Sequence, residues 1–116
     1  MKTIKHGAEF ADQVEKGSVR QAIRKARKMP IEVGDVLSHH CSQRPKGAKT
    51  LRTSTCTQVR SVVMAGSDKI FVTGRQLTQA QASTLALASG FKSPRTMCAA
   101  FEESHGLPFT GQVINW

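Results

Sequence analysis

The spacing of hydrophobic positions changes along the chain from helical to strand-like and back. Residues 8–16 place Phe10 and Val14 one helical turn apart, with acidic residues on the other sides. This pattern predicts a short amphipathic helix. Gly17 follows at the position where a helix commonly ends in a left-handed residue.

Two further helices are expected in the second half of the chain. Thr78 and Gln81 have the spacing of a capping box and predict a helix over 78–88. Ser93-Pro94 combines a capping serine with a proline at the first helical position, which predicts a helix over 93–105.

The other apolar stretches have the composition and alternation of strands. They are residues 17–24, 35–41, 51–64, 70–73 and 110–116. The long stretch reads either as one strand or as two joined at a bulge near Arg60. Five to six strands and about three short helices predict an α+β fold, a small β-barrel with the first helix plugging one end. The length of 116 residues indicates a single domain over 1–116.

Charge is concentrated in one third of the chain. The formal net charge is +9, and nine basic residues against two acids between Arg20 and Arg52 account for +7 of it. Such clustering favours nucleic acid or another polyanion as a partner. A solvated basic surface that only keeps the protein soluble is the alternative.

The basic residues gather in two loops, one after the strand that ends at Arg24 and one after Cys41. We expect both loops to lie at the mouth of a cleft facing the first helix, with Arg24 as the deepest donor and able to hold a phosphate or base carbonyl. The predicted nucleic-acid-binding residues are Arg20, Arg24, Lys25, Arg27, Lys28, Arg44, Lys46 and Lys49. The six aromatic residues mostly follow core periodicity, so a row of rings that stacks bases is not expected.

The cysteine and histidine pattern does not favour a metal site. His39, His40, Cys41 and Cys56 lack the paired short spacings of zinc ligands. Cys41 has no evident group to orient a base beside it, so a nucleophilic role is also disfavoured. We expect no bound metal and no cofactor.

Three widely spaced cysteines give no disulfide framework, which fits a reducing compartment. The chain shows no apolar run of signal-peptide or membrane-spanning length. We therefore expect a cytoplasmic protein that does not associate with membranes.

Two segments together resemble a known family. Gly17 to Arg24, followed by Pro30 and Gly34-Asp35-Val36-Leu37, is similar to the signature of ASCH domains of the PUA-like superfamily. The segment from Leu77 through Gly90-Phe91 to Phe109–Trp116 resembles a branch of that family found in phages and prophages. The resemblance implies a PUA-like barrel that binds RNA or modified nucleobases between the barrel and the first helix.

The resemblance also bears on catalysis. Some small ASCH proteins hydrolyse acetylated cytidine with a lysine, a threonine and a glutamate, and others have been proposed to cleave RNA. The corresponding positions here are Val19, Ala22 and Ser89, and of the motif only Arg24 remains. Valine and alanine supply neither a base nor a nucleophile nor an oxyanion donor.

Three function classes follow from the sequence. The first is a non-catalytic module that binds RNA or a nucleotide, with single-stranded DNA as a further ligand. The second is an amidohydrolase or nuclease that acts on a modified nucleoside or RNA with altered catalytic residues. The third is a phage protein whose basic face binds an acidic host protein. Binding to generic RNA that weakens with salt distinguishes the first from the third.

Overall fold

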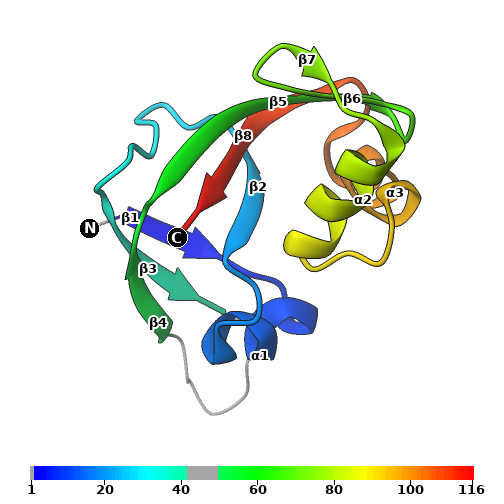
Figure 1. Cartoon of the computed structure of the whole chain (residues 1–116). Coiled ribbons are helices and arrows are strands. Elements are labelled where there is room, and N and C mark those ends of the chain that lie inside the picture. The colour runs from blue at the N-terminus through cyan, green and yellow to red at the C-terminus, as the bar shows by residue number, and fades with distance from the viewer. Residues whose placement is uncertain (1, 42–49) are drawn as a thin grey trace.

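The computed structural model describes residues 2–41 and 50–116. These residues form three helices and eight strands, which confirms the α+β class and the three short helices (Figure 1). The helices are α1 (Ala8–Lys16), α2 (Gln79–Ala88) and α3 (Pro94–His105). The strands are β1 (Lys2–Lys5), β2 (Gln21–Lys25), β3 (Val36–His40), β4 (Thr50–Thr55), β5 (Gln58–Gly66), β6 (Lys69–Val72), β7 (Arg75–Gln76) and β8 (Phe109–Asn115). Within the described ranges, no helix is both long enough and apolar enough to span a membrane.

The helix ends follow the signals in the sequence. Gly17 ends α1 in the left-handed region with φ of 82°. The Thr78 hydroxyl accepts from the Gln81 backbone N–H, and the Gln81 side chain accepts from the Thr78 backbone N–H. The Ser93 hydroxyl caps α3, and Pro94 stands at its first position. All three predicted caps are therefore confirmed.

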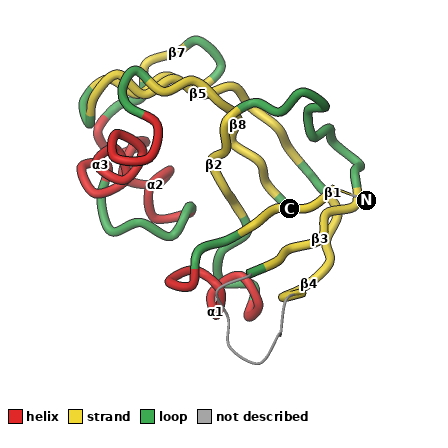
Figure 2. The backbone as a smooth tube through the Cα atoms, turned by 180° about the vertical axis from the view of Figure 1, so that it is seen from behind, coloured by secondary structure: helices red, strands yellow, loops and turns green. Residues whose placement is uncertain are grey.

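The strands fall into two sheets rather than one closed barrel (Figure 2). The smaller sheet has the order β1-β3-β4, and the larger has the order β2-β8-β5-β6-β7. β1 pairs with β3 in parallel, and the other pairs are antiparallel. The predicted single curved sheet is thus not confirmed, because β3 and β4 lie in the smaller sheet whereas β2, β5, β6 and β8 lie in the larger. The strand pattern also failed to indicate β1 and β7.

One bend connects the two sheets. The longest predicted strand is two strands, β4 and β5, and the break falls at Cys56 and Thr57 rather than near Arg60. The Cys56 backbone N–H donates to the carbonyl of Asp35 beside β3 at 2.8 Å, and the Thr57 N–H donates to the carbonyl of Asn115 in β8 at 2.9 Å. The chain therefore passes from the smaller sheet to the larger sheet within two residues.

The larger sheet has a hydrophobic core on each face, because successive strand residues point to opposite sides. Ala22 and Ile114 pack into the core formed with the smaller sheet and α1. Their neighbours Ile23 and Val113 pack into the core beneath α2 and α3. Figure 1 shows α2 and α3 together on one side of the larger sheet, with α1 at the end of the smaller one. β2 thus runs between the two cores and carries Arg24 to the space between them.

The close approach of β2 to β8 depends on Gly111. A Cβ atom at this position would lie 2.3 Å from the Arg24 backbone oxygen and 2.8 Å from the Phe109 ring. We expect Gly111→Ala to lower the free energy of unfolding by about 2 kcal/mol or more, because a paired backbone carbonyl has no room to move aside. Urea denaturation measures this loss.

Gly66→Ala is the matched control for this substitution. Its added Cβ would meet only the flexible end of the Asp68 side chain, at 3.3 Å. We expect a loss below about 1 kcal/mol there. Equal effects of the two substitutions would contradict the tight β2–β8 contact.

Candidate functional site

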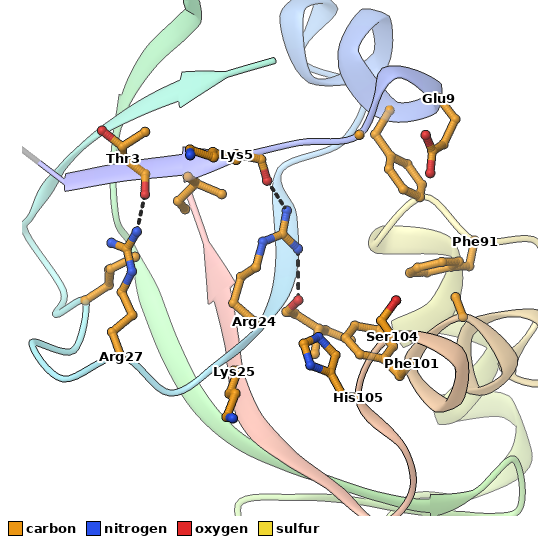
Figure 3. Close-up of a pocket in the computed structure, with 16 residues that line it drawn as sticks. Thr3, Lys5, Glu9, Arg24, Lys25, Arg27, Phe91, Phe101, Ser104 and His105 are labelled. Atoms are coloured by element: carbon orange, nitrogen blue, oxygen red, sulfur yellow. Dashed lines mark hydrogen bonds between the residues drawn. The ribbon is translucent and has the colours of Figure 1, made fainter. Parts of the chain in front are cut away.

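Two arginines bridge the gap between β1 and β2. β1 bonds to β3 along one edge, and its other edge leaves the carbonyls of Thr3 and Lys5 facing β2. The Arg24 Nη2 donates to the Lys5 carbonyl at 2.8 Å, and the Arg27 Nη2 donates to the Thr3 carbonyl (Figure 3). Arginine side chains therefore donate to backbone carbonyls that would otherwise accept hydrogen bonds from a neighbouring strand.

The loop after β2 is also fastened at its far end. The Lys2 ammonium donates to the Pro30 carbonyl at 2.7 Å and to the Asp35 carboxylate at 2.6 Å. This hydrogen bond from Lys2, followed by one from the Glu32 backbone N–H, holds the pKa of Asp35 below its usual range. Asp35 belongs to the Gly-Asp motif on which the family resemblance depends, and here it orders the basic loop.

A cavity of about 530 Å³ lies between this gap, the start of α1 and the end of α3. Arg24, Lys25 and Arg27 line it from β2 and the following loop. The opposite wall is aromatic, and Figure 3 shows Phe91 and Phe101 on the helix side, across from Arg24. Its volume is within the range of small-molecule sites.

The aromatic wall consists of Phe10, Phe91 and Phe101, which are all half-buried. The ring centroids of Phe10 and Phe91 are 5.4 Å apart, and those of Phe91 and Phe101 are 6.2 Å apart. Gly90 permits this arrangement, since its φ is 90° and a Cβ there would lie 2.8 Å from the Phe10 ring. Each of these rings also packs against a hydrophobic core. The expectation that no row of rings stacks bases stays a prediction.

The structure brings together three of the eight predicted site residues, namely Arg24, Lys25 and Arg27. Lys28 is exposed in the same loop but does not line the cavity. Arg20 is exposed and its Nε donates to the Gly17 carbonyl at 3.2 Å, away from this site. The remaining three, Arg44, Lys46 and Lys49, lie outside the described residues.

Arg24 is held in place by backbone carbonyls. Besides its bond to Lys5, its Nη1 donates to the Ile23 carbonyl at 2.9 Å. Burial, and secondarily the charge of Arg27, lowers the pKa of Arg24. A guanidinium nevertheless stays protonated in proteins. The single ion pair found in the described ranges joins Lys2 to Asp35, so no carboxylate there pairs directly with Arg24. Glu9 is the one acidic residue among those that line the cavity.

A chain of buried side chains leads from Arg24 into the core. The Nδ1 of His6 lies 3.4 Å from the Arg24 Nη2, and its Nε2 lies 2.9 Å from the Nδ1 of His39. The Nε2 of His39 lies 2.7 Å from the Ser54 hydroxyl oxygen. Because the guanidinium can only donate, His6 accepts at Nδ1 and donates from Nε2, and His39 in turn donates to Ser54.

This direction does not suit a nucleophilic serine. A base must accept the serine proton, whereas His39 donates a hydrogen bond to Ser54 in the tautomer that Arg24 imposes. Burial, and then the charges of Arg24 and His39, lowers the pKa of His6 to about 3. Burial, followed by the charge of Arg52 and two weaker contributions, lowers the pKa of His39 to about 4. Both rings are therefore neutral near pH 7.

The cysteines are free and buried, and burial raises the pKa of the Cys56 thiol. The described part of the chain contains no group of three or more His, Cys, Asp or Glu residues able to hold a metal ion.

The positions that the family resemblance associates with catalysis converge on a second, smaller cavity. Val19, Ala22 and Ser89 are buried and all line a space of about 30 Å³ beside Arg24. The Ser89 hydroxyl donates to the Leu85 carbonyl at 2.9 Å and accepts from the Gln21 amide at 2.7 Å. Its hydrogen bonds are thus used within the fold.

Comparison with known proteins does not identify a family: no family model, no curated protein and no solved structure matches the chain. The ASCH resemblance remains a prediction that rests on the motif residues quoted above.

The buried histidines predict a loss of stability in mild acid. In the unfolded chain a histidine titrates near pH 6.5, whereas His6 and His39 titrate near 3 and 4 in the fold. Below about pH 6.5 the unfolded state therefore binds more protons, so the free energy of unfolding falls as pH falls. The full slope is about 1.4 kcal/mol per pH unit for each histidine.

We expect urea denaturation to show lower stability at pH 5 than at pH 7, a window above the usual range of carboxylate titration. His6→Gln should reduce the slope of stability against pH, whereas His105→Gln, at an exposed position, should preserve it. Stability that is constant or increases toward pH 5 would show that the pair is not buried in neutral form.

Proposed function

We propose that this protein is a non-catalytic module that binds RNA or a nucleotide in the 530 Å³ cavity between the β1–β2 gap and α3. The observation that carries the proposal is the pairing of a cationic wall, Arg24, Lys25 and Arg27, with an aromatic wall in one cavity. A nucleotide has the same division, with an anionic phosphate at one end and a flat base at the other.

The aromatic wall suits a base. Phe10 and Phe91 meet edge to face at 68°, and Phe101 lies beside Phe91, so the rings are partly exposed to the cavity and fixed against one another. Stacking of a base on an aromatic ring is worth about 1–3 kcal/mol and tolerates any base. The wall would therefore bind an unpaired nucleotide with little sequence preference.

The cationic wall suits a phosphate. Arg24 and Arg27 each donate from one nitrogen to a β1 carbonyl. These hydrogen bonds fix the two guanidinium groups at the cavity, where they would otherwise move in solvent. Lys25 is exposed at the end of β2, at the rim. Phosphate contacts from such groups supply affinity and make it dependent on salt.

The non-catalytic part of the proposal rests on Val19, Ala22 and Ser89. Two of them lack any reactive group, and Ser89 is hydrogen-bonded to Leu85 and Gln21. Release of cytidine from N4-acetylcytidine faster than in a control without protein would favour the hydrolase alternative. A parent protein that fails to bind RNA but binds an acidic protein would favour the host-protein alternative.

The test compares two neighbouring lysines. Lys25 lines the cavity and Lys28 does not, although both are exposed in the same basic segment. We expect Lys25→Gln to weaken binding of a fluorescent single-stranded RNA and to reduce the slope of log affinity against log salt by about one unit. Lys28→Gln should change both quantities much less. Fluorescence anisotropy between about 50 and about 200 mM salt measures them.

Lys69→Gln, on β6 and outside the cavity, controls for net charge. Equal weakening by Lys25→Gln, Lys28→Gln and Lys69→Gln would indicate a diffuse basic surface and contradict binding in the cavity. Single-stranded and duplex DNA of matched length in the same assay show whether the site requires RNA or only an unpaired base.

A further inference from the structure

A second sizeable cavity, of about 380 Å³, lies between α2 and the larger sheet. Val72, Leu77 and Leu85 give it an apolar wall, and Gln21 and Arg60 contribute polar groups from β2 and β5. Neither the sequence motifs nor the proposed nucleotide site accounts for this cavity.

Arg60 stands where an apolar residue is expected. Along β5 it shares a face with Val62 and Met64, which are fully buried beneath α2 and α3. Arg60 continues that row to the cavity, and its side chain is half-buried. Placing a cation here removes it partly from water, which is unfavourable unless a partner compensates the charge.

The partners of Arg60 are neutral. Its Nη2 donates to the Gln21 amide oxygen at 3.3 Å and to the Asn115 amide oxygen at 3.2 Å. No carboxylate pairs with it anywhere in the ranges 2–41 and 50–116. Its Nε is buried and has no hydrogen-bond partner among the described residues.

Further hydrogen bonds hold the Gln21 and Asn115 amides in place. The Asn115 Nδ2 donates to the Gln21 Oε1 at 2.9 Å, and the Gln21 Nε2 donates to the Ser89 hydroxyl at 2.7 Å. The network therefore orients the Arg60 guanidinium at the cavity without neutralising it. A guanidinium that is oriented by hydrogen bonds but not neutralised is preorganised for an anionic ligand.

We propose that this cavity binds a small monoanionic organic acid, with its carboxylate on Arg60 and a short apolar body against Val72, Leu77 and Leu85. One guanidinium balances one negative charge. A dianion such as phosphate would leave a charge uncompensated beside an apolar wall. The volume lies at the lower end of the range for small-molecule sites, which fits a short acid.

This site does not depend on the proposed nucleotide site. The two cavities share no lining residue, although a separate space of about 30 Å³ is lined by Gln21 and Ser89 as well as by Arg24. Each proposal can therefore fail without the other.

The probe is hexanoate, titrated into the full chain and followed by amide chemical shifts and calorimetry. We expect saturable shifts around α2 and β5, no saturable binding of hexanamide or hexylammonium, and weaker binding of acetate and inorganic phosphate. Arg60→Gln should weaken hexanoate binding at least about tenfold, the loss expected for a charge-assisted contact.

Because Arg60→Gln also disturbs the amide network, a second variant blocks the cavity without touching Arg60. Ala88 is exposed on α2 and lines the cavity, so Ala88→Phe should fill it and weaken binding at least about tenfold by overlap with the ligand. Ala99→Phe, at an exposed position on α3 outside the cavity, is the matched control and should bind as the parent does. Lys25→Gln should likewise leave hexanoate binding unchanged, since Lys25 lines only the other cavity.

Absence of hexanoate binding to the parent, equal binding of hexanamide, or undiminished binding to Ala88→Phe would each overturn the proposal. Weakening by Lys25→Gln as large as that by Ala88→Phe would also overturn it, because the carboxylate would then occupy the nucleotide cavity.

Discussion

The candidate site depends on how β2 is held. β2 pairs with β8 along one edge, while its other edge faces β1, a strand of the other sheet. Two guanidinium groups close that gap by donating to β1 carbonyls. Backbone hydrogen bonds between β1 and β2 would have closed the surface, whereas the arginine side chains leave a cavity between the two sheets and the helices. The absence of pairing between β1 and β2 in the described structure thus opens the space in which a ligand can bind.

The fixed position of these two arginines changes how the basic residues at the end of β2 and in the following loop are interpreted. A run of cations in a loop is usually read as a set of mobile contacts for a polyanion. Here Arg24 and Arg27 are part of the fold, and Arg24 also sets the tautomers of the buried pair His6 and His39. Its charge is therefore linked by hydrogen bonds from the cavity to the core. Lys25, Arg27 and Lys28 are all exposed, and Arg27 is tied to β1 by its hydrogen bond to the Thr3 carbonyl.

Local signals in the sequence were sufficient for the helices, since the caps at Thr78 and Ser93 act within one turn of the chain. They were insufficient to predict β1, which is only four residues long and has one fully buried side chain. This strand is held by parallel pairing with β3, which lies more than thirty residues away in the chain. Without β1, the carbonyls that engage Arg24 and Arg27 could not be foreseen, nor could the division into two sheets. The aromatic wall was missed for a related reason: periodicity shows that Phe101 points inward from α3, but not that the space it faces is a cavity.

Intermolecular NOEs between adenosine 5′-monophosphate and the protein report where the base binds. We expect that H2 and H8 of the bound base show NOEs to ring protons of Phe10, Phe91 or Phe101, and that the Lys25 side-chain signals shift with them. A saturated complex whose base protons contact none of these rings, or a protein that binds neither this nucleotide nor RNA, would contradict a nucleotide site between the β1–β2 gap and α3.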